Sequence, residues 1–128
     1  MPLQINIQKD QPDAVTVGLT GELNSDTAAQ CEKEIDALLT PALKTLVLDL
    51  RHLKYISSIG LRLVLKAQKF LKKNGGQLVL RKMTAPVAKV FEIASMLPPD
   101  VRATKLSEDI FLDAVQRRES VKKHDISE

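Results

Sequence analysis

Hydrophobic residues near the start of the chain alternate with polar ones. Leu3, Ile5 and Ile7 occupy every second position, which is the pattern of a strand with one buried face. Residues 9–13, with the sequence KDQPD, carry turn-forming residues, and residues 14–19 form a second apolar run. The pattern therefore predicts an antiparallel hairpin at this end of the chain.

The next apolar residues recur at helical spacing. Asn24 or Ser25 is suited to cap the start of a helix, and Asp26 in a first turn would interact favourably with the helix dipole. Pro41 is expected to stop this helix. Its predicted apolar stripe consists of Ala28, Cys31, Ile35, Leu38 and Leu39.

An almost continuous apolar run follows at residues 46–50. This pattern predicts a central strand that is covered on both faces, with Val47 and Leu48 both buried. A second helix is predicted from about Gly60 to the glycine turn at residues 74–76, and residues 77–80 form a short strand after it. The apolar stripe of this second helix is predicted to be Leu61, Val64, Leu65, Gln68 and Leu71.

The last third of the chain predicts two more helices. Thr84 and Pro86 open the first of them, residues 101–104 read as a last strand, and Ser107 caps the second helix. The residues predicted to face inward are Val87, Val90, Phe91 and Ala94 on the first helix, and Ile110, Phe111, Ala114 and Val115 on the second.

These elements predict an α/β fold. Strand–helix–strand units occur twice, and right-handed crossovers would make their strands parallel. We expect a single domain at residues 1–116, with a mixed β-sheet of about four to five strands and about four helices packed against it. The charged residues 117–128 are expected to form a mobile C-terminal tail.

Composition narrows the class of protein. The chain has 128 residues, 44% of them hydrophobic and 27% charged, as is usual for a globular domain. No apolar run is long enough to cross a bilayer, and the first residues do not resemble a signal peptide. The single cysteine, Cys31, excludes an internal disulfide and is expected to be a buried apolar residue. We therefore expect a cytoplasmic protein without membrane insertion.

The residues that usually carry catalysis are not grouped. His52 and His124 lie far apart in the sequence, and Ser58 stands in I-S-S-I-G instead of the G-x-S-x-G of a hydrolase elbow. The chain has no glycine-rich phosphate loop and no cluster of metal ligands. We expect a binding protein, not an enzyme, with no cofactor and no metal.

Cations follow one face of the second helix. Arg62, Lys66, Lys69 and Lys73 recur at helical spacing opposite the apolar stripe, and Lys72 is close to them. Such a face is either solvated or a docking surface for an acidic partner. Nucleic acid is the weaker interpretation, because the net charge is only +3 and no aromatic residues alternate with the cations.

Two serines precede the same helix. One serine at this position is expected to cap the helix, and we assign that role to Ser57. The hydroxyl of Ser58 would then face outward, beside a Gly60 that leaves space for a kinase. A phosphate on this hydroxyl would be tolerated at the positive end of the helix and would add negative charge beside the cations.

Four ordered motifs resemble those of a known family. They are T-G-E-L-N at 20–24, L-V-L-D-L-R-H-L at 46–53, Y-I-S-S-I-G-L-R at 55–62 and N-G-G-Q-L-V-L at 74–80. From about Leu3 to Val115 the chain resembles a STAS domain, specifically a free-standing anti-sigma factor antagonist. The resemblance implies the STAS-type fold and a binding module of a partner-switching signalling pathway that regulates transcription.

The resemblance also implies partners and site residues. The partners would be an anti-sigma factor with a histidine-kinase-like ATPase fold, which is a serine kinase, and a metal-dependent serine phosphatase. The family's phosphorylated serine matches Ser58, with Ser57 as second choice. Family aspartates are replaced by Asn24 and Ser57, and the family's second hydroxyl by Ile59. The expected partner-binding residues are Asn24, Ser57, Ser58, Ile59, Gly60, Arg62, Lys66 and Lys69.

Two other functions within the same family stay open. A STAS subunit can dock on the ATPase of a lipid-transport ABC complex and regulate it, and a STAS domain that is not phosphorylated can scaffold a signalling assembly. The nature of the bound partner distinguishes these alternatives from the first.

Overall fold

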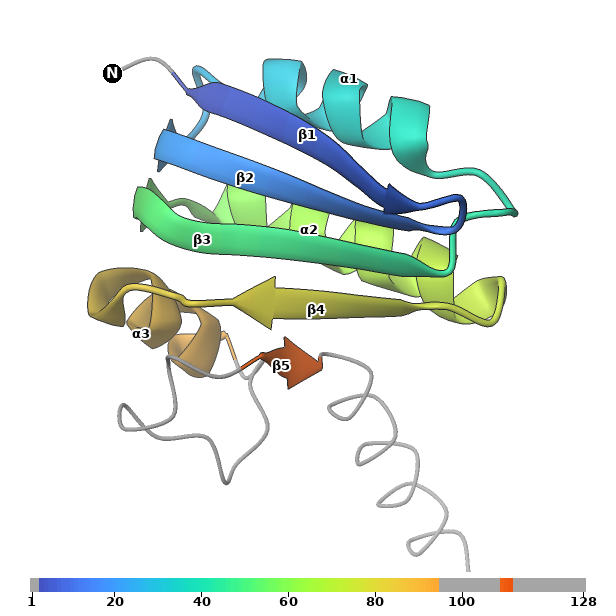
Figure 1. The fold of residues 1–128 in the computed structure, drawn as a ribbon. Coiled ribbons are helices and arrows are strands. Elements are labelled where there is room, and N and C mark those ends of the chain that lie inside the picture. Colours follow the sequence, from blue (N-terminus) through green and yellow to red (C-terminus); the bar gives the residue numbers. More distant parts are fainter. Residues whose placement is uncertain (1–2, 95–108, 112–128) are drawn as a thin grey trace, which may run out of the picture.

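The computed structural model describes residues 3–94 and 109–111. Their strands form one five-stranded sheet in the order β1-β2-β3-β4-β5 (Figure 1). The strands are β1 (Gln4–Gln11), β2 (Ala14–Leu23), β3 (Thr45–Ile56), β4 (Gln77–Arg81) and β5 (Ile110–Phe111). The helices are α1 (Ala28–Leu38), α2 (Ser58–Lys73) and α3 (Ala85–Ile93).

Strand directions make the sheet mixed, as the sequence predicted. β1 and β2 form the expected antiparallel hairpin, with Ile5 opposite Leu19. β2, β3 and β4 are parallel, because α1 and α2 provide the crossovers between them. The carboxyl ends of these three strands therefore lie at the same end of the sheet, where the three helices of the described residues begin (Figure 1).

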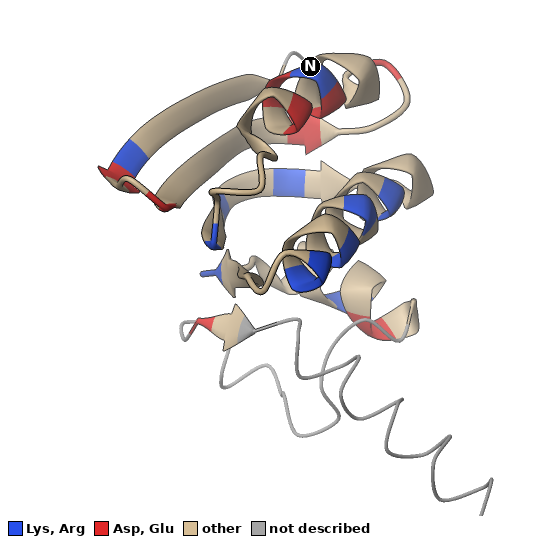
Figure 2. Cartoon of the chain, turned by 90° about the vertical axis from the view of Figure 1, so that its right-hand side faces the viewer, with Lys and Arg blue, Asp and Glu red and all other residues tan. Residues whose placement is uncertain are grey.

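The described helices all lie on one face of the sheet (Figure 2). Alternate residues of β2 point to this face and are buried, while the residues between them are half-buried. Leu46, Leu48 and Leu50 of β3 join the same core, which also contains Phe91 of α3. The prediction of helices packed against the sheet is confirmed for this face.

Val47 was predicted to be buried on the opposite face from Leu48. Both are buried, with 7% of Val47 and 0% of Leu48 exposed. Val47 is paired with Val79 of β4, which is also buried, and neither belongs to the core beneath the helices. The burial predicted for β3 is thus confirmed, but no described helix covers the second face of the sheet.

β3 runs six residues beyond the apolar run that predicted it. Its pairing with β2 slips at two places, between Gly18 and Thr20 and between Gly21 and Glu22. At each slip β3 contains one extra residue, which is the geometry of a β-bulge. As a result Leu50, Leu53 and Ile56 are buried at intervals of three residues, so the alternation that marks a strand is lost.

The ends of α2 agree with the sequence, but its buried face is rotated. The chain leaves the helix through Gly75, whose φ of 77° favours glycine. Leu63 and Ala67 are buried, whereas the predicted Leu61 and Leu65 are half-buried. Close contact of α2 with the sheet places its smallest residues inward. The buried residues of α2 are Gly60, Leu63, Val64, Ala67, Gln68 and Leu71.

Ile110 and Phe111 were predicted to lie on a helix, and this is wrong. They form β5, in which Ile110 pairs with Leu80 and Phe111 with Val79 of β4. The guanidinium of Arg81 donates to both carboxylate oxygens of Asp109 at 3.0 and 3.1 Å, beside this pairing. Backbone pairing with the edge of β4 therefore outweighs the local helical pattern. The predicted strand at 101–104, the domain end at 116 and the tail at 117–128 lie outside the described residues.

Candidate functional site at the start of α2

The candidate site lies where β2 and β3 end and α2 begins. Leu23 and Ile56 are the last paired residues of the two strands. The backbone N–H of Ser57 then donates to the carbonyl oxygen of Leu23 over 2.9 Å. The turn that starts at Asn24 and the start of α2 are thereby adjacent, so the structure brings these distant predicted residues together.

Asn24 or Ser25 was predicted to cap the first helix, and Asn24 makes the hydrogen bonds of a cap, although the regular helix α1 begins later, at Ala28 after Thr27. The side-chain oxygen of Asn24 accepts hydrogen bonds from the backbone N–H groups of Asp26 and Thr27, at 2.9 and 3.2 Å, and its carbonyl oxygen accepts from the N–H of Ala28 at 2.9 Å. Asp26 thus lies in the turn that leads into α1. An aspartate would accept the same two bonds, so the asparagine keeps the shape of the turn and removes one negative charge.

The hydroxyl of Thr27 closes this turn from the inside. It donates a hydrogen bond to the carbonyl oxygen of Glu22 over 2.8 Å. It also accepts a hydrogen bond from the backbone N–H of Asn24 over 3.0 Å. Thr27 is 7% exposed, and its polar atom is therefore satisfied within the protein. The role of Thr27 was not predicted from the sequence, although threonine side chains often form hydrogen bonds with nearby backbone groups in turns.

Ser57 is the N-cap of α2, as predicted. Its backbone is extended, and its hydroxyl oxygen accepts from the N–H of Gly60 at 3.4 Å. Ser58 is the first residue of the helix and is exposed. Within the described part of the chain, its hydroxyl has no hydrogen-bond partner. The two serines therefore have different environments, one bound to the backbone and one open to a reagent.

Gly60 was expected to leave space for a kinase, and the structure contradicts this. Gly60 is buried against the ends of the two strands. A Cβ atom at this position would lie 2.7 Å from Ile56 Cγ1 and 2.8 Å from Leu23 Cγ. The missing side chain therefore allows α2 to approach the sheet, and it cannot offer a surface to a partner.

Two large apolar side chains near Ser58 are exposed. Ile59, in the first turn of α2, is 39% exposed, and Tyr55, near the end of β3, is 49% exposed. Ile59 was among the predicted partner-binding residues, but Tyr55 was not. The signal for Tyr55 was hidden by the bulges of β3, which change which residues of this segment face outward.

The cations of α2 are all exposed, and Figure 2 shows how they recur along the helix. Arg62 and Lys69 are exposed and have no ion-pair partner among residues 3–94 and 109–111. Lys66 differs, because its ammonium group contacts Glu32 at 2.9 Å and Asp36 at 3.1 Å, both on α1. Hydrogen bonds to Glu32 and then Asp36 raise the pKa of Lys66. Lys66 is therefore already paired within the protein, and of the three cations predicted to bind a partner Arg62 and Lys69 remain available.

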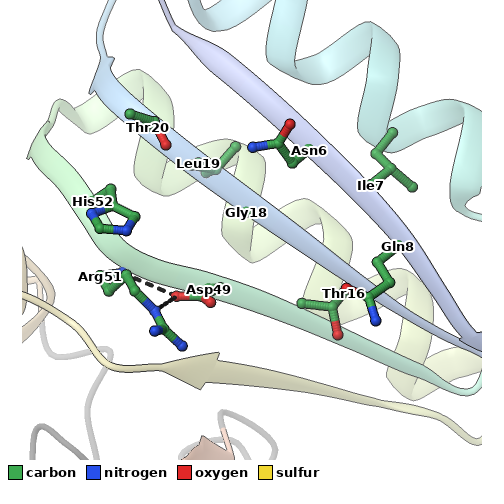
Figure 3. Close-up of a pocket in the computed structure, with 10 residues that line it drawn as sticks. All are labelled: Asn6, Ile7, Gln8, Thr16, Gly18, Leu19, Thr20, Asp49, Arg51 and His52. Atoms are coloured by element: carbon green, nitrogen blue, oxygen red, sulfur yellow. Dashed lines mark hydrogen bonds and ion pairs between the residues drawn. The ribbon is translucent and has the colours of Figure 1, made fainter.

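The open face of the sheet carries a shallow hollow of about 390 Å³ (Figure 3). Gly18 forms part of its floor because it lacks a side chain, and Asn6, Thr20 and His52 lie around it. Asp49 accepts from Arg51 at 3.1 Å, and no hydrogen bond joins His52 to a described hydroxyl or carboxylate. The hollow therefore has no linked nucleophile and base, and none of the predicted site residues lines it.

The described residues offer no group of three side chains able to hold a metal ion. No helix among them has the length and apolar character required to cross a membrane. Cys31 is fully buried, and burial raises the pKa of its thiol to about 12, with smaller contributions from Glu34 and Glu32. The thiol is thus protonated at neutral pH and packs as an apolar group.

Comparison with known proteins places this geometry in a family. A family model described as "Mlab, STAS domain" matches residues 7–97. BtrV of Bordetella bronchiseptica, provisionally named as an anti-sigma factor antagonist, is 39% identical over 94 residues, which are 73% of this chain and 81% of BtrV. The anti-sigma F factor antagonist of Paenibacillus polymyxa is 26% identical over 97 residues, which are 75% of this chain and 82% of that protein.

Solved structures share the fold. The anti-sigma factor antagonist SpoIIAA in its unphosphorylated form gives a TM-score of 0.66 at 24% identity, covering 71% of this chain and 80% of that one. The phosphorylated form of SpoIIAA from Bacillus gives a TM-score of 0.61 at 23% identity, covering 71% of this chain and 83% of that one. The family model, the relatives and the fold agree, and the chain belongs to the STAS domain family.

Proposed function

We propose that this STAS domain is an anti-sigma factor antagonist that acts in a partner-switching pathway in the cytoplasm. It would bind an anti-sigma factor that is also a serine kinase and would be switched by phosphorylation of Ser58. The observation that carries the proposal is the difference between the two serines at the start of α2: Ser57 caps the helix, whereas the exposed hydroxyl of Ser58 has no hydrogen-bond partner among the described residues. The relatives named as anti-sigma factor antagonists support the class of partner.

The chemistry of the site suits a reversible switch. A phosphate on Ser58 would stand in the first turn of α2, where the helix dipole favours negative charge. Because Ser58 is exposed and its hydroxyl makes no hydrogen bond within the described residues, modification would break no contact of the fold. The phosphate would add nearly two negative charges to the surface that meets the partner. A metal-dependent serine phosphatase would restore the binding state.

The docking surface that we propose differs from the predicted set. We place Ser58, Ile59, Arg62 and Tyr55 at its centre because all four are exposed around the start of α2. Asn24 shapes the neighbouring turn with bonds to the backbone. The partner would thus meet a mixed apolar and basic surface, for which an acidic region with exposed apolar side chains is complementary.

Three predicted residues have other roles in this proposal. Ser57 acts through its cap and Gly60 through its close packing, so both support the surface from within. Lys66 is engaged by α1. Lys69 lies eleven residues beyond Ser58, about 16 Å along the helix axis at 1.5 Å per residue, and would contribute a long-range attraction.

A kinase assay tests the proposal directly. The wild type, Ser58→Ala and Ser57→Ala are incubated with the candidate kinase and ATP, and phosphate is mapped by mass spectrometry. We expect one phosphate on Ser58 in the wild type and in Ser57→Ala, and none in Ser58→Ala. Phosphate on Ser57, or on neither serine, would contradict the assignment of the switch.

Binding measurements test the consequence. Ser58→Ala should bind the anti-sigma factor whether or not ATP is present, and Ser58→Asp should bind it more weakly while staying folded. Unchanged binding by a folded Ser58→Asp would favour a scaffolding STAS domain that is not switched. If pull-down from lysate recovers an ABC-transporter ATPase and no anti-sigma factor, the transport-subunit alternative replaces our proposal.

A further inference from the structure

Ser58 and Arg62 are neighbours on the surface of α2. They are four residues apart in a helix that runs from Ser58 to Lys73, and both are exposed. Side chains at this spacing lie one above the other on the same helix face. The other neighbour at suitable spacing, Leu61, is half-buried and apolar. Arg62 is therefore the cation of α2 that is best placed to meet a group attached to Ser58.

Arg62 is also available for such a group. None of the described carboxylates lies within ion-pair distance of its guanidinium, whereas Lys66, one turn further on, is held by Glu32 and Asp36. The two cations differ in chemistry as well. A guanidinium presents a planar set of donors that fits a phosphate in a bidentate way, but an ammonium acts as a point charge.

We propose that Arg62 is the intrahelical partner of a phosphate on Ser58. This inference rests on the proposed switch and names the residue through which the modified state is held. The order of the charges is favourable, because an acidic group that precedes its basic partner by four residues agrees with the helix dipole. A phosphate carries about twice the charge of a carboxylate and offers three acceptor oxygens, so the pair is stronger than an ordinary surface pair.

The pairing gives Arg62 two alternative partners. In the unmodified protein no described carboxylate pairs with its guanidinium, which can therefore meet an acidic group of the anti-sigma factor. After phosphorylation the same guanidinium is bound to its own helix. Modification would therefore act twice on the docking surface, by adding negative charge at Ser58 and by withdrawing the nearest cation. Lys66 cannot replace Arg62 without leaving Glu32 and Asp36.

Phosphorus NMR on the phosphorylated protein tests the pair. Phosphoserine is installed at position 58 during translation, so that no kinase is needed, and the pH titration of the phosphate is recorded. The full chain is compared with Arg62→Gln, with Arg62→Lys, which keeps the charge, and with Lys69→Gln as a control on the same helix. A nearby cation favours the dianion and lowers its pKa.

We expect the titration midpoint in the parent protein to lie a few tenths of a pH unit below that of Arg62→Gln. A single exposed charge is screened by water and permits no larger shift. Arg62→Lys should recover part of the shift, Lys69→Gln should leave it unchanged, and 1 M NaCl should remove it. Because Arg62 is exposed, these variants should fold, and circular dichroism checks this.

Equal titration midpoints in the parent protein and Arg62→Gln would overturn the pairing. A shift in Lys69→Gln as large as that in Arg62→Gln would also overturn it, because it would indicate a general electrostatic effect of the cations on the helix. These outcomes are independent of the kinase assay. If the kinase never modifies Ser58, the proposed switch fails while the NMR result stands. If the kinase modifies Ser58 but the midpoints are equal, the switch stands and the role of Arg62 fails.

Discussion

The N–H group of Ser57 donates a hydrogen bond to the carbonyl oxygen of Leu23 over 2.9 Å. This contact joins the end of β2 to the residue that caps α2. It lies directly after the last paired residues of β2 and β3, so the start of the helix is fixed to both strands. The position of Ser58 is consequently determined by the sheet. Substitutions at the neighbouring Ser57 and Gly60 should therefore change the free energy of unfolding.

Replacement of Ser57 by alanine should destabilise the protein. The variant loses the side-chain oxygen that accepts from the N–H of Gly60, and the loss of an N-cap typically costs about 1 kcal/mol. Urea unfolding of Ser57→Ala and Ser58→Ala measures the difference. Ser58→Ala serves as the matched control and should stay within about 0.5 kcal/mol of the wild type, as is usual at an exposed position. Equal losses in both variants would show that the cap contributes nothing special.

Gly60→Ala should be destabilising although alanine is the better helix former. Its Cβ atom would lie under 3 Å from side-chain carbons of Ile56 and Leu23, and overpacking of this kind costs about 1–3 kcal/mol. Gly18→Ala is the control, since the nearest atoms to a Cβ there, in Asn6, are 3.9 Å away. Chemical denaturation should find Gly18→Ala neutral or slightly more stable than the wild type. A Gly60→Ala variant as stable as Gly18→Ala would contradict the close packing of α2.

The cations of α2 should separate into two classes. Reversing the charges of Arg62 and Lys69 should weaken partner binding and slow association, most strongly at low ionic strength, because both are exposed and unpaired among the described residues. Neutralising Lys66 in Lys66→Gln should instead lower the melting temperature slightly at low salt, because the ion pairs with Glu32 and Asp36 are lost. Partner affinity and melting temperature, each measured at several salt concentrations, distinguish the cations that bind the partner from the one that stabilises the fold. Strong loss of affinity in Lys66→Gln alone would reverse the assignment.

Stability should fall in alkali because of Cys31. The thiol has a pKa of about 12 in the folded protein against 9.0 as its ordinary value. The contribution of the protonated thiol to the free energy of unfolding is therefore complete below about pH 9. It is lost as the pH rises toward 12, because the thiol of the unfolded chain releases its proton first. Urea unfolding across this range should show a steeper loss in the wild type than in Cys31→Ala, by up to a few kcal/mol. Parallel pH profiles in the two proteins would contradict the buried, protonated thiol.

The elements that the sequence could predict were those with a regular local pattern. The hairpin, the parallel strands and the Ser57 cap each depend on a few neighbouring residues, and these predictions are confirmed. The errors arose where tertiary contacts decide. Ile110 and Phe111 join the sheet because the edge of β4 is available.

In the candidate site, too, the contacts that the sequence did not predict depend on the folded structure. The N–H of Ser57 and the Oδ1 atom of Asn24 meet backbone groups that only the folded turn brings near. The pairing of Lys66 with α1 and the burial of Gly60 likewise depend on how two elements pack. Periodicity along one element contains no information about its neighbour, so the sequence could name these residues but could not predict these contacts between elements.

The two bulges of β3 make the length of this strand critical. Residues 51–55 determine by how much the chain has rotated when it reaches Ser57, since each extra residue turns the following side chains to another face. Deleting one residue there would remove one of the two bulges and would direct the serines and the whole of α2 away from their present orientation. Natural variants and engineered linkers should therefore tolerate length changes in the hairpin turn at Pro12 far better than in this short segment.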